Sequence, residues 1–143
     1  MKYYFYIVVS LLTIISGCVG PPDYADGLLE NNPAIVNGSD YFSLSLLGDK
    51  YTENNDWDLL LNLTEADKIL ITMIVKELSA SPSDSSFLYL INEQSDTIYS
   101  AGLFSEVIVV NELEISEFGV PKTVILNCNN LSGRLEYQII KTQ

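Results

Sequence analysis

Cys18 stands in the setting that points most directly to chemistry. It is one of two cysteines, and it follows a run of apolar and hydroxyl-bearing residues from Tyr3 to Ile15 that ends in two small residues. A basic start at Lys2, an apolar centre and a small-residue end are typical of a secretory signal. Small side chains let a peptidase reach the backbone. The sequence therefore predicts a secretory signal with its cleavage site at the small residues before Cys18.

The stretch from Ile15 to Cys18, "ISGC", resembles the lipobox of prokaryotic lipoproteins. The resemblance implies that residues 1–17 are a lipoprotein signal peptide and that Cys18 receives a diacylglyceryl thioether. Two acyl chains hold a protein stably, because each buried CH₂ group contributes about 0.8 kcal/mol. We therefore expect an extracytoplasmic protein anchored in the membrane through this lipid, at the cell surface or in the periplasm. An uncleaved anchor stays open, since the run counted on to Val19 approaches the roughly 20 apolar residues that cross a bilayer.

The chain is strongly acidic. It carries 19 Asp and Glu against 7 Lys and Arg, a net charge of −12, and it has no cluster of basic residues. Nucleic-acid phosphates and anionic lipid headgroups would both repel such a surface, so we expect no nucleic-acid partner. From Glu77 to Pro121 there is no basic residue at all. This acidic stretch is interpreted as a solvated surface, and a cation-binding face is the alternative.

Catalytic side chains are scarce. The chain has no histidine, which removes the commonest general base and rules out a Ser-His-Asp triad. The second thiol, Cys128, lies in a β-branched run and is expected to be a small buried hydrophobe. Neither a zinc-ligand spacing nor a GxxxxGK phosphate loop occurs. We therefore expect a protein that is not an enzyme, although a carboxylate pair for glycoside hydrolysis stays open among so many acids.

Calcium is the cation that fits the available ligands. Carboxylate and amide oxygens bind it, and the densest group of them runs from Glu53 to Asp58. The candidate ligands are Asn55, Asp56 and Asp58. Their spacing is not that of an EF-hand loop, so a polar turn before a strand is the competing interpretation. No other cofactor is expected.

Several side chains suggest contact with sugars. Asn37, Asn62 and Asn130 each begin an N-glycosylation acceptor pattern, which matters only in a host that glycosylates. Tyrosines could stack on sugar rings, but in or beside strands they are ordinary cross-strand neighbours. Trp57 alternates with leucines, and we therefore expect it in the core.

Residues 18–40 follow the predicted lipid on Cys18 and are rich in Pro, Gly, Asn and Asp, which predicts a flexible tether. Docking of the segment "LLENNPAIV" on the domain is the alternative for residues 28–36. Residues 41–143 form the expected folded domain. Alternation of apolar and polar residues predicts strands over Tyr41–Leu47, Trp57–Leu63 and Glu112–Ser116. The residue types of Lys68–Leu78 are compatible with a helix and with a strand, and its Ile, Thr and Val residues favour a strand.

Similar short segments continue to Ile140, with turn residues between them, and total about eight strands without a convincing helix. Many short strands at near-regular spacing indicate an all-β, antiparallel two-sheet β-sandwich. With Cys18 lipidated, Cys128 would have no partner within the chain, so such a domain must be stabilised by its core instead of by disulfides.

The segment "NDWDLLLNLTEADKILITMIVKE", the segment "DSSFLYLINEQSDTIYS" and the late "SGRLEYQII" together resemble the bacterial pre-peptidase C-terminal domain. The positions that carry the resemblance are Trp57, Asp84, Leu88, Leu90, Ser100, Gly133, Tyr137 and Ile139. The resemblance implies a jelly-roll-like sandwich that serves as an accessory or carbohydrate-binding-like module. It brings no transferable set of functional residues.

We therefore expect a lipid-anchored, non-catalytic binding or interaction module with a protein or carbohydrate ligand. A structural or accessory subunit of a surface or secretion complex is the first alternative, and would present an exposed apolar patch or an unpaired edge strand. A hydrolase with an unrecognised carboxylate pair is the second alternative, and would need a cleft that holds two acids.

Overall fold

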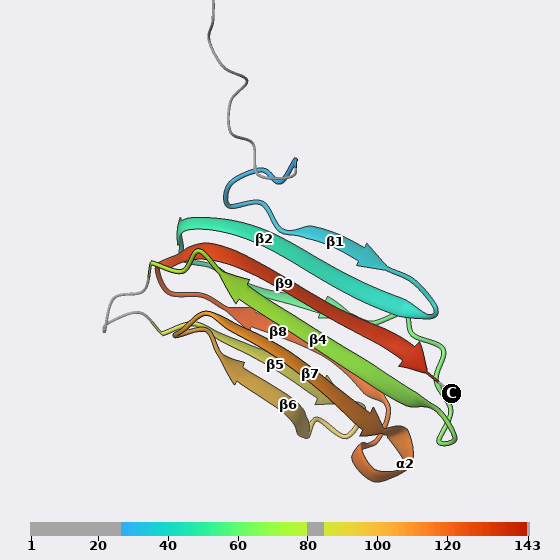
Figure 1. Cartoon of the computed structure of the whole chain (residues 1–143). Helices are drawn as coiled ribbons and strands as arrows, with labels where there is room; N and C mark the ends of the chain where they lie inside the picture. Colours follow the sequence, from blue (N-terminus) through green and yellow to red (C-terminus); the bar gives the residue numbers. More distant parts are fainter. Residues whose placement is uncertain (1–26, 80–84, 143) are drawn as a thin grey trace, which may run out of the picture.

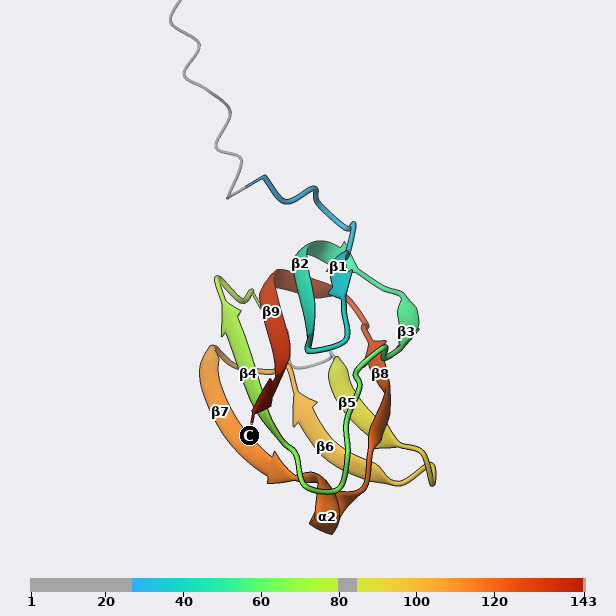
Figure 2. The same cartoon turned by 90° about the vertical axis from the view of Figure 1, so that its right-hand side faces the viewer.

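The computed structural model describes residues 27–79 and 85–142, which form two antiparallel sheets lying face to face (Figure 1; Figure 2). Sheet A has the strand order β1-β2-β9-β4-β7, and sheet B has the order β3-β8-β5-β6. The elements are β1 (Ala34–Asn37), β2 (Tyr41–Tyr51), β3 (Asn54–Asp58), β4 (Lys68–Lys76), β5 (Phe87–Asn92), β6 (Thr97–Gly102), β7 (Val107–Glu114), α2 (Ile115–Phe118), β8 (Pro121–Asn127) and β9 (Leu131–Thr142). The predicted antiparallel two-sheet sandwich is confirmed, with nine strands in the described ranges where about eight were expected.

Strand β4 illustrates why these residues form a sandwich. Its side chains alternate strictly, so that Ile69, Ile71 and Met73 lie in the core while the residues between them face outward. Burial of each such side chain contributes roughly 1.5–3 kcal/mol. A helix would distribute the same residues around its circumference and expose about half of them. The prediction of a strand here is confirmed.

The core is centred on Tyr137 of β9, the middle strand of sheet A. Its ring lies 6.5 Å from that of Phe42 and 6.2 Å from that of Tyr99, measured between centroids. Trp57 packs against the same core, with its ring 6.5 Å from that of Phe42, as its alternation with leucines predicted. The buried Tyr137 hydroxyl has no hydrogen-bond partner among the described residues.

The prediction of a tether up to residue 40 is wrong over its last part, where the alternative of a docked segment holds. Residues Ala34–Asn37 form strand β1, which pairs with β2 from Phe42 to Ser45. Asn31 continues this contact, because its backbone N–H donates to Leu47 O and its side chain exchanges two hydrogen bonds with the backbone of Asp49. The folded domain therefore begins before residue 41, because an 11-residue β2 offers backbone groups that the preceding chain satisfies.

Two predicted strands have different bounds. The run Trp57–Leu63 leaves the strand after Asp58, although Leu59, Leu61 and Leu63 still pack on the core. Its leucines alternate, but the described neighbours offer backbone partners at only two points, Leu59 N–H to Lys122 O and Asn62 N–H to Ser39 O. The predicted strand Glu112–Ser116 is the end of the longer strand β7, which stops at Glu114 because α2 begins at Ile115. No helix in the described part of the chain is long and apolar enough to cross a membrane.

Candidate binding faces

The outer face of sheet A carries most of the exposed large apolar side chains in the described ranges. These are Val36 (48% exposed), Tyr41 (46%), Ile108 (73%), Val110 (60%) and Ile140 (40%). All five alternate with core residues along their strands, so they point away from sheet B. Figure 2 shows this face along the left side of the molecule, where no described element covers it. Tyr41 and Ile140 are cross-strand partners, and Ile108 and Val110 are neighbours on β7, so the face carries two apolar groups that are candidate contact surfaces.

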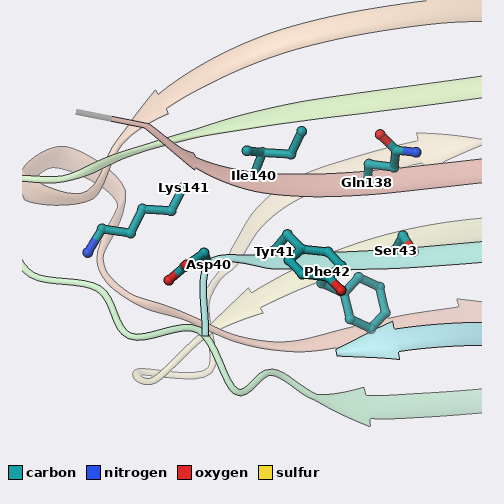
Figure 3. A pocket seen from close by; sticks show the side chains of 7 residues that line it. All are labelled: Asp40, Tyr41, Phe42, Ser43, Gln138, Ile140 and Lys141. Carbon is teal, nitrogen blue, oxygen red and sulfur yellow. The ribbon is translucent and has the colours of Figure 1, made fainter. Parts of the chain in front are cut away.

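An open hollow of about 410 Å³ lies in this face over β2 and β9. Tyr41 and Ile140 are cross-strand partners, as are Ser43 and Gln138. Figure 3 shows Tyr41 on β2 and Ile140 on β9, with Asp40 and Lys141 toward one end. The hollow therefore combines an aromatic and an aliphatic surface with a polar rim, which is the composition of a ligand site.

The rim is held by hydrogen bonds at the end of β9. Lys141 N–H donates to Asp40 O at 2.8 Å, and Lys141 Nζ lies 2.8 Å from Asn62 O and 3.1 Å from Asp67 Oδ2. The same carboxylate oxygen accepts hydrogen bonds from the N–H and Oγ1 of Thr64, which lower the pKa of Asp67, and Lys141 adds to this effect. Lys141 is thus positioned by a carboxylate that stays ionised.

The charges on the outer face of sheet A lie largely in ion pairs. Arg134 Nε lies 2.8 Å from Glu136 Oε1 near the centre of the sheet. Lys68 Nζ lies 3.3 Å from Glu112 Oε1 and 3.0 Å from Glu114 Oε1, and these two carboxylates raise the pKa of the Lys68 ammonium. One lysine therefore stands between two acids at the end of β7, which leaves that end negative.

A second hollow, of about 490 Å³, lies beside the β5–β6 turn and α2. Its buried polar side chain, Asn92, donates to Phe118 O and accepts hydrogen bonds from the backbone N–H groups of Gln94 and Asp96. The Asn92 amide thus stabilises the turn, which is a structural role.

The outer face of sheet B carries an aromatic cluster of Phe87, Tyr89 and Phe104. The rings of Phe87 and Tyr89 are stacked at 6.0 Å, and the edge contact of Phe87 with Phe104 is 5.1 Å between centroids. Phe104 is 51% exposed and lies so close to Gly102 that a Cβ atom there would overlap its ring. Sequence reasoning treated Tyr89 as an ordinary cross-strand neighbour and did not identify the cluster, because Phe104 follows the strand and meets Phe87 only in the fold.

Strand alternation separates the candidate calcium ligands. Asp56 and Asp58 are exposed on the outer side of β3, where Asp58 Oδ1 accepts a hydrogen bond from Thr123. Asn55 points to the opposite side and donates to the Tyr51 hydroxyl at 2.6 Å. Within the described residues, no group of three or more Asp, Glu, His or Cys side chains is placed to hold a metal ion. The geometry thus brings together two of the three candidate ligands.

The three candidate glycosylation sites differ in their surroundings. Asn37 Nδ2 donates to Asp58 O, and Asn37 Oδ1 accepts from Leu60 N–H, so this amide fastens β1 to the chain after β3. Asn62 is exposed, whereas Asn130 is half-buried with a positive φ of 62°. Of the three positions, Asn62 is the accessible one. The lipidation candidate Cys18 lies outside the described residues, as does Asp84.

Cys128 is 5% exposed, and burial raises the pKa of its thiol to about 11. The thiol is therefore protonated at neutral pH and is a poor nucleophile. Its predicted place as a small buried hydrophobe is confirmed.

Comparison with models of known protein families found no match, and a search of curated proteins found none. The resemblances to the lipobox and to the pre-peptidase C-terminal domain therefore stay predictions.

Proposed function

We propose that the chain is a non-catalytic binding module, anchored on the extracytoplasmic side of a membrane by a lipid on Cys18, that binds a protein partner through the outer face of sheet A. The observation that supports it is the number of exposed apolar side chains on that face, two of which, Tyr41 and Ile140, line a hollow with a polar rim. Where the protein partner is a larger surface complex, the chain is an accessory subunit of that complex.

The alternatives receive less support from the same residues. A hydrolase would need two acids facing each other across a cleft. Two acids on the outer face of sheet A, Glu112 and Glu114, share the ammonium of Lys68 on an open strand. The buried thiol of Cys128, protonated at neutral pH, offers no substitute nucleophile.

The proposed lipid anchor is tested by measuring the intact mass of the protein extracted from a lipoprotein-processing host. We expect a chain that begins at Cys18 and carries a diacylglyceryl group, and a Cys18→Ser variant without that mass. A full-length chain without added mass would refute the lipid anchor and leave the uncleaved apolar segment as the alternative.

The binding face is tested by photo-crosslinking in cells that carry the native partner. A benzoyl-phenylalanine in place of Tyr41 reports on the outer face of sheet A, and the same group in place of Ile125 reports on the outer face of sheet B, since Ile125 pairs with the exposed Asp56. We expect a defined cross-linked species from position 41 and none from position 125. Equal cross-linking at both positions, or none at either, would refute the proposed function.

A carbohydrate is the second candidate ligand, and the aromatic cluster on sheet B is the observation that favours it. Aromatic rings beside a polar side chain are suited to sugar CH groups and hydroxyls. The ring of Phe104 is exposed, those of Phe87 and Tyr89 are half-buried, and Asn127 is the cross-strand partner of Phe87. Affinity electrophoresis in gels with neutral polysaccharides tests it. We expect retardation that Phe104→Ala abolishes and Tyr41→Ala leaves unchanged, and equal mobility with and without polysaccharide would exclude this ligand.

A further inference from the structure

Strand β7 is the free edge of sheet A. It pairs with β4 over Val107–Glu114, and no described strand lies on its other side. Figure 2 shows β7 at the margin of the molecule, at the opposite end of the sheet from the short edge strand β1. Its outward backbone N–H and C=O groups therefore have no partner strand, and such a row is a template for an added strand.

The side chains of β7 do not protect this edge in the usual way. Natural edges carry Lys, Pro or bulges, whereas the centre of β7 is the run Val107 to Val110. Ile108 and Val110 are 73% and 60% exposed, and their neighbours on β4 are Ile74 and Thr72. Ile108 is the most exposed large apolar side chain in the described ranges. The edge therefore offers both unpaired backbone and apolar surface to a partner.

Acidic side chains bracket this apolar centre. Glu106 precedes the strand, and Glu112 and Glu114 end it, with Glu117 in α2 beyond them. All four are exposed, and the basic groups adjoining them on β4 are Lys68 and Lys76. Lys68 is already held between Glu112 and Glu114. A second copy of this acidic chain would bring like charges together, whereas a basic segment would meet complementary charge.

We propose that the β7 edge binds an extended segment of another protein, with β-branched apolar residues at its centre and Lys or Arg at its ends, which joins sheet A as a further strand. Backbone hydrogen bonds supply the affinity of such pairing, and side chains select the partner. This inference rests on the proposed function, because it specifies the part of the outer face that recognises the partner.

The test uses the full chain in mild detergent and a fluorescent nine-residue peptide of alternating valine and threonine with a lysine at each end. Fluorescence anisotropy measures its binding. We expect the dissociation constant to rise at least about tenfold when glutamate replaces both lysines, because the charge complementarity is reversed. Alternate N–H groups of a strand point to opposite sides, so two peptides are made, each N-methylated on one of the two alternating sets of amides. We expect the peptide whose methylated amides face β7 to lose binding and the other peptide to keep it.

Two protein variants locate the site. Ile108→Lys places a cation at the apolar centre of β7, and Leu60→Lys makes the same change in the chain after β3, outside sheet A and its hollow. Both side chains are exposed, so neither change empties the core. We expect Ile108→Lys to weaken peptide binding at least about tenfold and Leu60→Lys to leave it within about twofold.

Three outcomes would overturn the inference: equal effects of the two variants, no binding of the lysine peptide, or a dimer in sedimentation velocity that Ile108→Lys dissociates. The last outcome would make a second copy the occupant of the edge. Retained cross-linking at position 41 with no peptide binding would overturn this inference alone. Loss of that cross-linking would refute the proposed function itself.

Discussion

The buried hydroxyl of Tyr137 leads to the sharpest expectation about stability. Its ring lies between those of Phe42 and Tyr99 at the centre of the core, and its oxygen has no hydrogen-bond partner among the described residues. Removing water from a hydroxyl without a replacement partner costs about 1–3 kcal/mol. Tyr137→Phe keeps the ring and its stacking and removes that cost. We therefore expect this variant to be more stable than the native chain.

The expected gain in the free energy of unfolding is about 1 kcal/mol, the lower end of that cost, because a small void replaces the oxygen. For a domain of this size, such a gain raises Tm by roughly 3–5 °C. Urea unfolding followed by fluorescence, with thermal unfolding followed by circular dichroism, measures both quantities. Tyr99→Phe is the matched control. The Tyr99 hydroxyl is half-buried and lies 4.0 Å from Met73 Sδ, so its removal is expected to change stability by less than about 0.5 kcal/mol.

The pH dependence gives a second readout of the same group. Burial raises the pKa of Tyr137 well above its ordinary value of 10. The folded state thus binds a proton that the unfolded state loses above pH 10, so this contribution to stability is complete below pH 10 and declines as the pH rises above it. The Phe variant lacks that decline. A Tyr137→Phe variant less stable than the native chain at neutral pH would refute the reasoning, because it would show that the hydroxyl makes a favourable interaction.

The remaining expectations concern three other places in the fold. Burial raises the pKa of Cys128 from 9.0 to about 11, so its contribution to the free energy of unfolding should fall by about 1.4 kcal/mol per pH unit between pH 9 and pH 11. Cys128→Ala should remove this contribution, which urea unfolding at several pH values in that range measures. Gly102→Val should destabilise the domain by about 1–3 kcal/mol, because its side chain overlaps the ring of Phe104, and a Gly102→Val, Phe104→Ala double variant should recover part of the loss. Millimolar calcium should leave Tm unchanged, since Asn55 and Asp58 point to opposite sides of β3; a rise that Asp58→Asn abolishes would establish calcium binding instead.

Local sequence patterns predicted those elements that can be recognised without knowing which strand lies beside them. β4 is a strand because its apolar residues alternate, and that alternation is visible without knowing which strand lies beside it. Cys128 is buried, as its place at the end of a β-branched run predicted, although strand β8 ends one residue before it at Asn127. The leucines after Trp57 show the limit of such patterns. They alternate and pack on the core as predicted, yet the chain there is not a strand, because a strand also requires a neighbour with matching backbone groups.

The residues of the candidate site could be identified only from the pairing register of the strands and from the strand order, which shows the edges of sheet A. The run Val107–Val110 is apolar on both sides, which by itself predicts a strand covered on both faces. Only the strand order β1-β2-β9-β4-β7 shows that its outer face and its edge lie open. Likewise, Tyr41 and Ile140 are far apart in the chain and form one hollow only because β2 pairs with β9 in a fixed register.

The sequence by itself determined the class of the fold, since the two-residue period of strands and the turn residues between them are properties of the chain alone. It also determined which side chains enter the core. The tertiary structure decided which of the outward side chains meet, that β1 joins sheet A instead of the tether, and that Asn55 turns away from Asp56 and Asp58. The physical reason is that alternation is set within a strand, whereas pairing and edges are set by backbone hydrogen bonds between distant strands.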